Sequence, residues 1–166
     1  MVFVNKVLRI GMRELDKRIL LQLLENSGQP VKEMAKKVGA SRQTVAKKIE
    51  QLKAEGIITS FTTKLDPEKL GLGTKAYILL REDPRSELRR KNEIVIKQFY
   101  QVTEVYRLFG RYSAVLEVLV RNSKELAQLI KRIHGLKGVR ETETFLVHST
   151  VKNVPEAPFV RVLKSS

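Results

Sequence analysis

The chain contains no cysteine and no tryptophan, and only two of its 166 residues are histidine. Without cysteine it can form no disulfide and no thiolate metal site, and it can use no cysteine nucleophile. Two histidines also argue against a zinc site built from imidazole ligands. The sequence has no secretory signal and no apolar run near the length of a membrane span. We therefore expect a cytoplasmic protein with neither a metal nor another cofactor.

Acidic residues are scarce, because 18 Asp and Glu stand against 32 Lys and Arg, giving a formal net charge of +14. Hydrophobic residues make up 42% of the chain, which is enough to bury a core and too many for a disordered basic tail. The positive charge makes nucleic acid the first partner to consider, ahead of an anionic membrane surface. Residues 1–70 carry 14 basic and 8 acidic side chains, and residues 71–166 carry 18 and 10. This even spread does not locate the binding surface.

Three helices are predicted before residue 57, each followed by residues that stop a helix. The first begins near Glu14 and stops at Asn26-Ser27-Gly28, where Gly28 is predicted to adopt a left-handed cap. Pro30 suits the first turn of the second helix, which ends at Gly39. Ser41 is predicted to cap the third helix with its hydroxyl group.

The junction between the second and third helices has the spacing of a helix-turn-helix. Ala35, Gly39 and Val45 fall at relative positions 0, 4 and 10. A small residue lets the helices cross closely, glycine allows the positive φ of the turn, and a branched residue wedges the third helix against the second. In such a motif the N-terminal part of the third helix enters the major groove of double-stranded DNA.

The candidate DNA-binding residues lie on this third helix, at 41–55. They are Ser41, Arg42, Gln43, Thr44, Lys47 and Lys48. Arg and Gln can make bidentate contacts to guanine and adenine edges, and Thr can contact a thymine methyl group or a phosphate. Lys47 and Lys48 suit the phosphate backbone better. The alternative is a solvated helical face, although such a face needs no Arg-Gln-Thr run directly after a capped turn.

The rest of the chain alternates predicted strands and helices. Residues 57–65 are β-rich, and residues 66–73 are typical of a linker and turn. Strands are predicted at 74–82, 103–109, 112–121 and 139–152, with helices from Pro84 to about residue 100 and from Asn122 to Gly135. The order β-α-β-β-α-β builds a four-stranded antiparallel sheet with two helices on one face. Residues 115–120 are apolar on both strand faces, so we expect the open face to pair with a second copy.

Motifs in both halves of the chain, from about Met12 to Lys152, carry a family resemblance. They are Asp16-x-x-Ile19-Leu20, Glu33-Met34-Ala35-x-x-x-Gly39-x-Ser41-x-x-x-Val45, Leu52-x-x-x-Gly56-x-Ile58, Leu65-Asp66-Pro67-x-x-Leu70-Gly71, Gly110-x-Tyr112 and Gly138-Val139-x-x-Thr142-x-Thr144. With these motifs the sequence resembles the Lrp/AsnC (feast/famine) family of transcription regulators.

The element order and the resemblance together imply an α+β fold with two domains. A helix-turn-helix, winged-helix-like domain is expected at 12–57, followed by a linker strand and turn at 58–73. A ferredoxin-like βαββαβ domain of the RAM type, for ligand sensing and oligomerisation, is expected at 74–152, with a C-terminal tail at 153–166.

The resemblance also implies a sequence-specific regulator whose partners are double-stranded DNA and further copies of itself. The linker strand, about 58–64, would pair across a homodimer, and dimers would assemble into larger rings, an octamer of dimers. A small-molecule effector, usually an amino acid, would bind between dimers. The ligand-binding residues that the resemblance implies are Gly110, Arg111, Tyr112, Ser113, Thr142 and Thr144.

The sequence departs from the family pattern at the ligand loop. The usual Thr-Gly-x-Tyr-Asp is here Phe109-Gly110-Arg111-Tyr112-Ser113. Serine cannot supply the negative charge that would hold an ammonium group, and Arg111 favours a carboxylate or another anion. We therefore expect a weak response, or none, to common amino acids.

Two further departures lie in the first part of the chain. Val31 stands where the family usually has a hydroxyl group near the start of the second helix, so a cap worth about 1 kcal/mol is lost. Residues 1–11 precede the matching region, and they either add a strand or helix or lie before a true start at Met12.

Two other functions could use the same residues. An architectural protein would coat DNA without an effector, and the basic run Arg85, Arg89, Arg90 and Lys91 could extend the DNA track, with a solvated face as the alternative. An enzyme on this fold, such as a tetrapyrrole decarboxylase, would use His134, His148 or the arginines near Arg107. The sequence has no phosphate loop and no nucleophile constellation, so we expect that the protein is not an enzyme.

Overall fold

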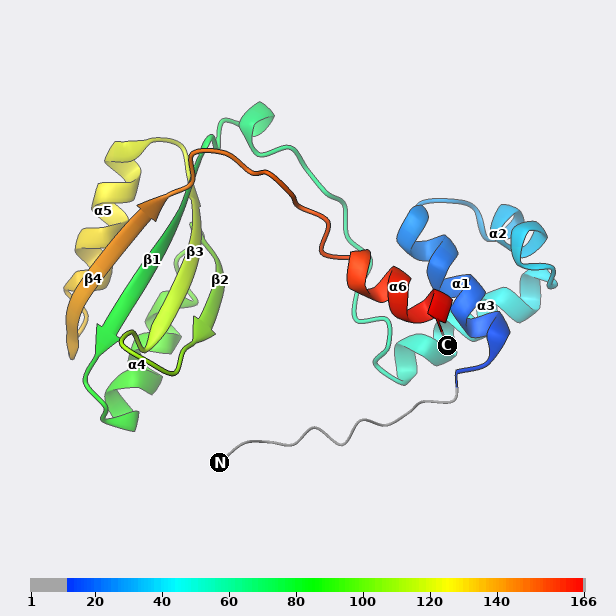
Figure 1. The fold of residues 1–166 in the computed structure, drawn as a ribbon, viewed down its shortest axis with the longest axis horizontal. Helices are drawn as coiled ribbons and strands as arrows, with labels where there is room; N and C mark the ends of the chain where they lie inside the picture. Colours follow the sequence, from blue (N-terminus) through cyan, green and yellow to red (C-terminus); the bar gives the residue numbers. More distant parts are fainter. Residues whose placement is uncertain (1–11, 166) are drawn as a thin grey trace. The chain divides into compact units, whose positions relative to one another are not determined.

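The computed structural model describes residues 12–165, so the expectation of an added strand or helix at 1–11 falls outside the described residues. The chain divides into two compact units (Figure 1). One unit comprises Lys64–Val151, and the other combines the described residues before and after it. Each unit has its own cluster of buried apolar side chains.

The first unit is a helical domain. Its first three helices are α1 (Glu14–Glu25), α2 (Val31–Val38) and α3 (Arg42–Ala54). One apolar stripe on each helix faces the other two, as the helical spacing predicts. The buried core residues are Ile19, Leu20, Met34, Ala35, Val38, Val45, Ile49 and Leu52. As the sequence indicates, α2 begins at Val31 without a side-chain cap.

The turn between α2 and α3 has the predicted geometry. Gly39 ends α2 with φ 65° and ψ 42°, in the left-handed region. Ser41 caps α3, because its Oγ accepts a hydrogen bond from the Thr44 backbone N–H at 3.0 Å. The prediction for Gly28 is wrong, since its φ is not positive. The Asn26 side chain instead accepts the Gly28 backbone N–H at 3.0 Å, which forms a local turn without a left-handed residue.

Residues 57–65 do not form the predicted β-rich segment. Ile57 and Ile58 direct their backbone N–H groups back to the Leu52 carbonyl, at 2.9 and 3.1 Å, and so cap the C-terminal end of α3. The residues that follow, up to Leu65, form no strand. A strand needs a neighbouring strand for its backbone hydrogen bonds, and the described part of this single chain provides none there.

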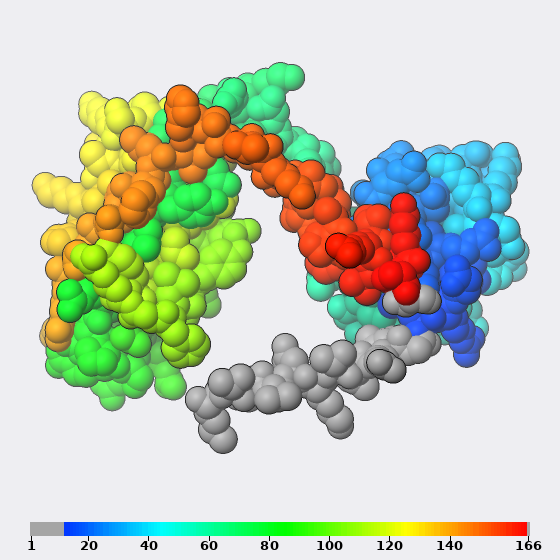
Figure 2. Space-filling model, viewed as in Figure 1, coloured from blue at the N-terminus to red at the C-terminus, as the bar shows by residue number. Residues whose placement is uncertain are grey.

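The C-terminal segment, expected only as a tail, ends in a helix that belongs to the first unit. α6 (Ala157–Ser165) packs against α1, and Leu163 contacts the core of the helical domain. Figure 2 shows the red atoms of α6 against the blue atoms of α1. The helical domain is therefore built from both ends of the described chain.

The second unit is a four-stranded antiparallel sheet with two helices on one face, as the element order predicts (Figure 1). Its elements are β1 (Thr74–Glu82), α4 (Ser86–Ile96), β2 (Val102–Arg107), β3 (Ala114–Val120), α5 (Ser123–His134) and β4 (Val139–Leu146). The strands lie in the order β2-β3-β1-β4. Alternate residues of β1 and β3 are buried against the helices, among them Ile78, Leu80, Leu116 and Val118.

The bounds of the elements differ from the predictions by a few residues. β4 ends at Leu146 rather than at 152, and α4 ends at Ile96 rather than near 100. Strands β2 and β3 leave residues 108–113 as a connecting loop, which we call the hairpin loop. Within residues 12–165, no helix is both long enough and apolar enough to cross a membrane.

We predict that Gly39→Ala lowers the stability of the helical domain by about 1–2 kcal/mol, because an L side chain is strained at a left-handed φ. An added Cβ would meet only the Arg18 side chain, at 3.8 Å, so crowding adds little to this cost. Far-UV circular dichroism during urea unfolding measures the loss. Gly28→Ala is the control, with an expected change below about 0.5 kcal/mol.

Tyrosine fluorescence makes this measurement specific to one unit. All four tyrosines lie in the unit Lys64–Val151, and the chain has no tryptophan. The tyrosine-detected transition of Gly39→Ala should stay at the wild-type urea concentration. An unchanged circular dichroism transition in Gly39→Ala would contradict the prediction.

Candidate functional site

The N-terminal end of α3 leaves three of the predicted base-reading and phosphate-binding residues exposed. Arg42, Gln43 and Lys47 make no side-chain hydrogen bond or ion pair with any other described residue. Thr44 is also exposed, but its Oγ1 lies 2.8 Å from the Ser41 Oγ. Ser41 and Thr44 therefore stabilise the start of the helix, while the other three side chains are free to contact a partner.

Lys48 does not point outward, so the prediction that it contacts phosphate is corrected. Its Nζ lies 3.2 Å from Asp16 Oδ1 and 3.4 Å from Oδ2, and its side chain is only 20% exposed. Asp16 is buried on α1. Separating α3 from α1 would leave these two largely buried charges without a partner. The ion pair therefore holds α3 against α1.

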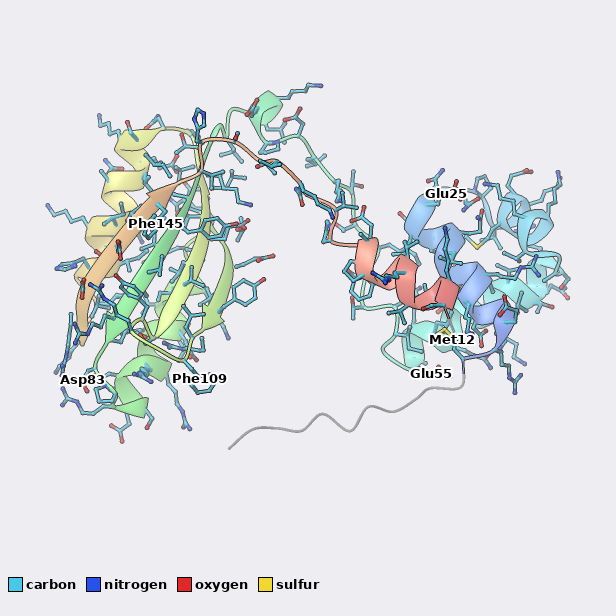
Figure 3. All side chains as sticks on the ribbon, in the orientation of Figure 1. Met12, Glu25, Glu55, Asp83, Phe109 and Phe145 are labelled. Atoms are coloured by element: carbon cyan, nitrogen blue, oxygen red, sulfur yellow. The ribbon has the colours of Figure 1, made fainter. Side chains whose placement is uncertain are left out.

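The hairpin loop and the end of β1 line an open pocket of about 520 Å³. The loop itself lines this pocket together with Arg81, Glu82 and Arg89. It therefore contains four of the six predicted ligand-binding residues, the run Gly110 to Ser113. Phe109 at the tip of the loop is fully exposed, and Figure 3 shows it at the same end of the sheet as Asp83.

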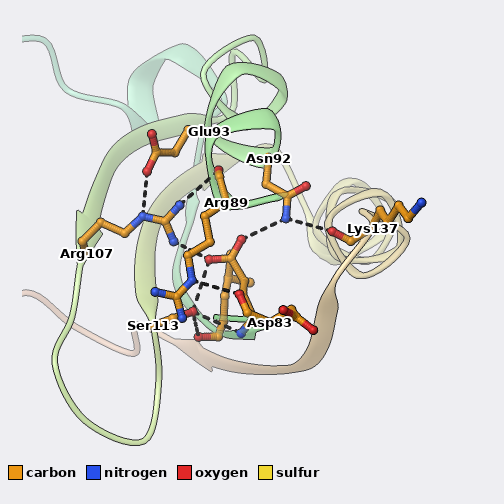
Figure 4. Close-up of polar contacts among 9 residues, drawn as sticks. Asp83, Arg89, Asn92, Glu93, Arg107, Ser113 and Lys137 are labelled. Carbon is orange, nitrogen blue, oxygen red and sulfur yellow. Dashed lines mark hydrogen bonds and ion pairs between the residues drawn. The ribbon is translucent and has the colours of Figure 1, made fainter. Parts of the chain in front are cut away.

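Ser113 is hydrogen-bonded to the end of β1 and is not free in the pocket (Figure 4). Its Oγ lies 3.0 Å from the Leu80 carbonyl oxygen and 3.2 Å from Glu82 Oε2. The same Oγ accepts the Glu82 backbone N–H at 3.1 Å. The Glu82 carboxylate thus lies next to Ser113, the position at which the family pattern has an aspartate. This carboxylate comes from the end of β1 and not from the hairpin loop.

Glu82 is the buried charge of this site, with a side chain that is only 1% exposed. Its Oε1 accepts a hydrogen bond from Asn92 Nδ2 at 2.9 Å, and its Oε2 pairs with Arg107 (Figure 4). Arg107 Nε also donates to Glu93 at 2.8 Å. Burial lowers the pKa of Arg107, but the hydrogen bonds to the two glutamates raise it by more. Sequence reasoning missed Glu82 and Asn92, whose only signal is a polar residue at a core-facing position of an apolar strand or helix.

Thr142 and Thr144 lie away from the pocket. They are the β4 partners of Leu80 and Ile78, and directly paired residues share a face, so both threonines lie on the helix-covered side of the sheet. Thr142 Oγ1 is 3.4 Å from His134 Nδ1 at the end of α5. One copy of the chain therefore does not bring the six predicted ligand-binding residues together. Among residues 12–165, no group of three or more His, Asp and Glu side chains could hold a metal ion.

Two side chains of the hairpin loop, Arg111 and Tyr112, contact β4 on the open face of the sheet. The Tyr112 hydroxyl donates to Glu143, and this hydrogen bond raises the pKa of the tyrosine above its usual 10.0. Arg111 lies 3.4 Å from Glu141, and so does Arg81. One carboxylate therefore serves two guanidinium groups.

The basic run at the start of α4 is partly used within the domain. Arg85 donates to Asp83, with Nε 3.0 Å from Oδ1, and this hydrogen bond holds the pKa of Asp83 well below its usual range. Arg89 Nε donates to the Asp83 carbonyl oxygen at 3.0 Å. Arg90 and Lys91 are exposed.

The open face of the sheet carries a charged cluster whose members satisfy one another. Glu117 lies 2.8 Å from Lys75 Nζ and accepts hydrogen bonds from the Tyr77 hydroxyl at 2.9 Å and Thr103 Oγ1 at 3.2 Å. Burial raises the pKa of Glu117, and the bonds from Lys75 and Tyr77 lower it by more. Partly exposed apolar side chains surround the cluster, namely Leu79, Val115 and Leu119.

We predict that Glu82→Gln lowers the free energy of unfolding of the second unit by about 1–3 kcal/mol, because it removes the charge that compensates Arg107. The expected loss is smaller than for a fully buried ion pair, because Arg107 is 34% exposed and keeps its bond to Glu93. Tyrosine fluorescence during urea unfolding measures the change. Glu87→Gln, an exposed position on α4, serves as the control, and an equal effect of both variants would contradict the prediction.

Comparisons with known proteins agree with both units. The Lrp/AsnC ligand binding domain matches residues 75–157, and a winged helix-turn-helix DNA-binding domain matches residues 12–59. The transcriptional regulator FL11 of Pyrococcus horikoshii is 31% identical over 154 residues, which cover 91% of this chain and 99% of that protein.

Solved structures show the same architecture. An AsnC family regulator from Agrobacterium tumefaciens matches with a TM-score of 0.82 at 28% identity, over 89% of this chain and 97% of that one. A transcriptional regulator of Neisseria meningitidis, solved as an L-methionine complex, has the same fold, with a TM-score of 0.85 at 20% identity, over 91% and 99% of the two chains. The chain therefore belongs to the Lrp/AsnC family of DNA-binding transcription regulators.

Proposed function

We propose that the protein regulates transcription by placing the N-terminal end of α3 in the major groove of double-stranded DNA. The observation that carries this proposal is the exposed trio Arg42, Gln43 and Lys47 in the first two turns of the helix that Ser41 caps. Arg42 and Gln43 would contact base edges, and Lys47 would contact phosphate. The role is one of binding and not of catalysis.

The ion pair between Lys48 and Asp16 supports this assignment of roles. Lys48 is held by Asp16 of α1 and is not available to phosphate. Of the two lysines expected to contact phosphate, Lys47 is the one that makes no ion pair with the described residues. The same pair fixes the rotation of α3, and so fixes which of its side chains face outward. Base recognition depends on such fixed orientation, because a bidentate contact tolerates little misplacement.

We further propose that two copies associate through the open face of the sheet, and that dimers assemble further, to an octamer of dimers. Leu79, Val115 and Leu119 offer an apolar surface there. The charged Glu117 is already neutralised within its own chain, so covering it leaves no unpaired charge. A homodimer would also present two copies of α3 to the paired half-sites that such proteins commonly read.

The pocket at the hairpin loop is the proposed effector site. It has a volume within the usual range for small-molecule sites, and it contains apolar, aromatic and charged side chains. The Neisseria meningitidis neighbour is a complex with L-methionine, which supports a small-molecule effector for this fold. In this chain the proposed contacts are Gly110, Arg111, Tyr112 and Ser113, while Thr142 and Thr144 would have to act from another part of an assembly.

The DNA proposal predicts different effects for two α3 variants. Arg42→Ala should cost about 1–3 kcal/mol on a selected site and much less on random duplex, because it removes a base contact. Lys47→Ala should weaken binding to both DNAs alike and lower the slope of log affinity against log salt by about 1. Fluorescence anisotropy on a site selected from random duplexes by the wild-type protein measures both effects.

Lys36→Ala is the matched control for these variants, because Lys36 lies on α2 and pairs with Glu33 at 3.4 Å. It should leave both affinities and the salt slope at their wild-type values. Equal losses on selected and random DNA for Arg42→Ala would show that this residue does not read bases.

The dimer proposal predicts that Leu79→Arg yields monomers, because it places an unpaired charge at the centre of the apolar part of the open face. Light scattering coupled to size-exclusion chromatography gives the mass directly. Ile94→Arg, on the exposed side of α4, is the control and should keep the wild-type mass. A dimeric Leu79→Arg variant would refute association through this face.

A further inference from the structure

The pocket at the hairpin loop is lined by more basic than acidic side chains. Three arginines line it, Arg81, Arg89 and Arg111, against the single carboxylate Glu82. What a pocket binds depends on the charges that remain after its own side chains have paired. The pairing of each of these four groups therefore decides which ligand chemistry the pocket favours.

The carboxylate of Glu82 is fully engaged within the protein. Asn92 donates to one of its oxygens at 2.9 Å, while Arg107 and Ser113 contact the other. Its side chain is only 1% exposed, so a ligand cannot reach it without breaking these contacts. An ammonium group entering the pocket would thus meet no available carboxylate on the lining.

The guanidinium of Arg89, by contrast, is not neutralised. Its Nε donates to a neutral carbonyl oxygen, that of Asp83, at 3.0 Å, and it makes no ion pair with any other described residue. Arg81 and Arg111 share the one carboxylate of Glu141, each at 3.4 Å. One carboxylate, that of Glu141, thus faces two guanidinium groups and Arg89 has none, so the pocket presents a net positive charge to a ligand.

We propose that this effector pocket takes a small carboxylate that lacks an amino group, a 2-oxo or 2-hydroxy acid with an apolar side chain. The proposal rests on the effector site proposed above and assigns its ligand class. Arg89 and Arg111 bind the carboxylate, because guanidinium and carboxylate groups match in charge and geometry. Leu108, Phe109 and the Tyr112 ring contact the apolar side chain. The ammonium group of an amino acid would be repelled by the arginines.

The test compares two ligands that differ only at C2, where one carries an ammonium group and the other a ketone oxygen. Isothermal titration of the full-length protein with L-methionine and with its 2-oxo analogue, 4-methylsulfanyl-2-oxobutanoate, is carried out at one fixed ionic strength. The oxo acid should bind at least about tenfold more tightly, since the polar difference between the two ligands lies at the charged end of the pocket. Inorganic phosphate, tested in parallel, should bind more weakly than the oxo acid because it has no apolar part.

Two arginine variants test whether the oxo acid binds in this pocket. Arg89→Gln should weaken oxo-acid binding by about tenfold or more, because it removes the unneutralised guanidinium. Arg121→Gln is the matched control, because Arg121 lies beyond the end of β3 opposite to the hairpin loop, and it should bind as the wild type does. DNA affinity of Arg89→Gln is measured as well and should stay within twofold of the wild type.

The outcomes separate this proposal from the effector site on which it rests. Tighter binding of L-methionine that is lost in Arg89→Gln would overturn the ligand class while leaving the effector site in place. Absence of binding by all three probes would overturn both, although DNA binding through α3 would stand. Equal affinity for phosphate and the oxo acid, or a parallel loss of DNA affinity in Arg89→Gln, would show a general anion surface and overturn the proposal.

Discussion

The buried carboxylate of Glu82 is the constraint on which the second unit's pocket depends. A charge that is nearly inaccessible to water must be compensated by neighbouring groups, and here those groups come from α4, β2 and the hairpin loop. Each of these elements is thereby tied to the end of β1 (Figure 4). The hairpin loop keeps its position because Ser113 bonds to the same strand, so the shape of the pocket follows from satisfying one charge.

A similar constraint acts in the helical domain. Asp16 on α1 is buried and pairs with Lys48 on α3, so the two helices are joined by a polar contact as well as by their apolar faces. Apolar packing tolerates small rotations of a helix, whereas a paired buried charge favours one arrangement. In both units an ion pair thus determines which neighbouring side chains remain available for a partner.

Periodicity and turn chemistry predicted the elements that depend on local sequence. The helix-turn-helix, the Ser41 cap and the strand at 74–82 are of this kind, because each depends on residues close together in the chain. Apart from the local turn at Gly28, the main errors concern contacts between distant residues. Lys48 was expected to be exposed because its partner is 32 residues away, and the β-rich segment at 57–65 lacks a neighbouring strand in one chain. The packing of α6 against α1 joins opposite ends of the described chain, which helical spacing does not reveal.

The ion pairs of the protein, more than its net charge, indicate which basic side chains are available to a partner. The net charge of +14 is spread evenly along the sequence, yet many arginines of the second unit are neutralised by nearby carboxylates, as Arg85 is by Asp83 and Arg107 by Glu82. Other basic groups make no ion pair with a described residue, and these include Arg42 and Lys47 at the start of α3 and Arg89 in the pocket. The loss of the usual aspartate at Ser113 therefore does more than remove one negative charge. It leaves the pocket with a carboxylate that is already paired and an arginine that is not, and the proposed ligand class rests on this imbalance.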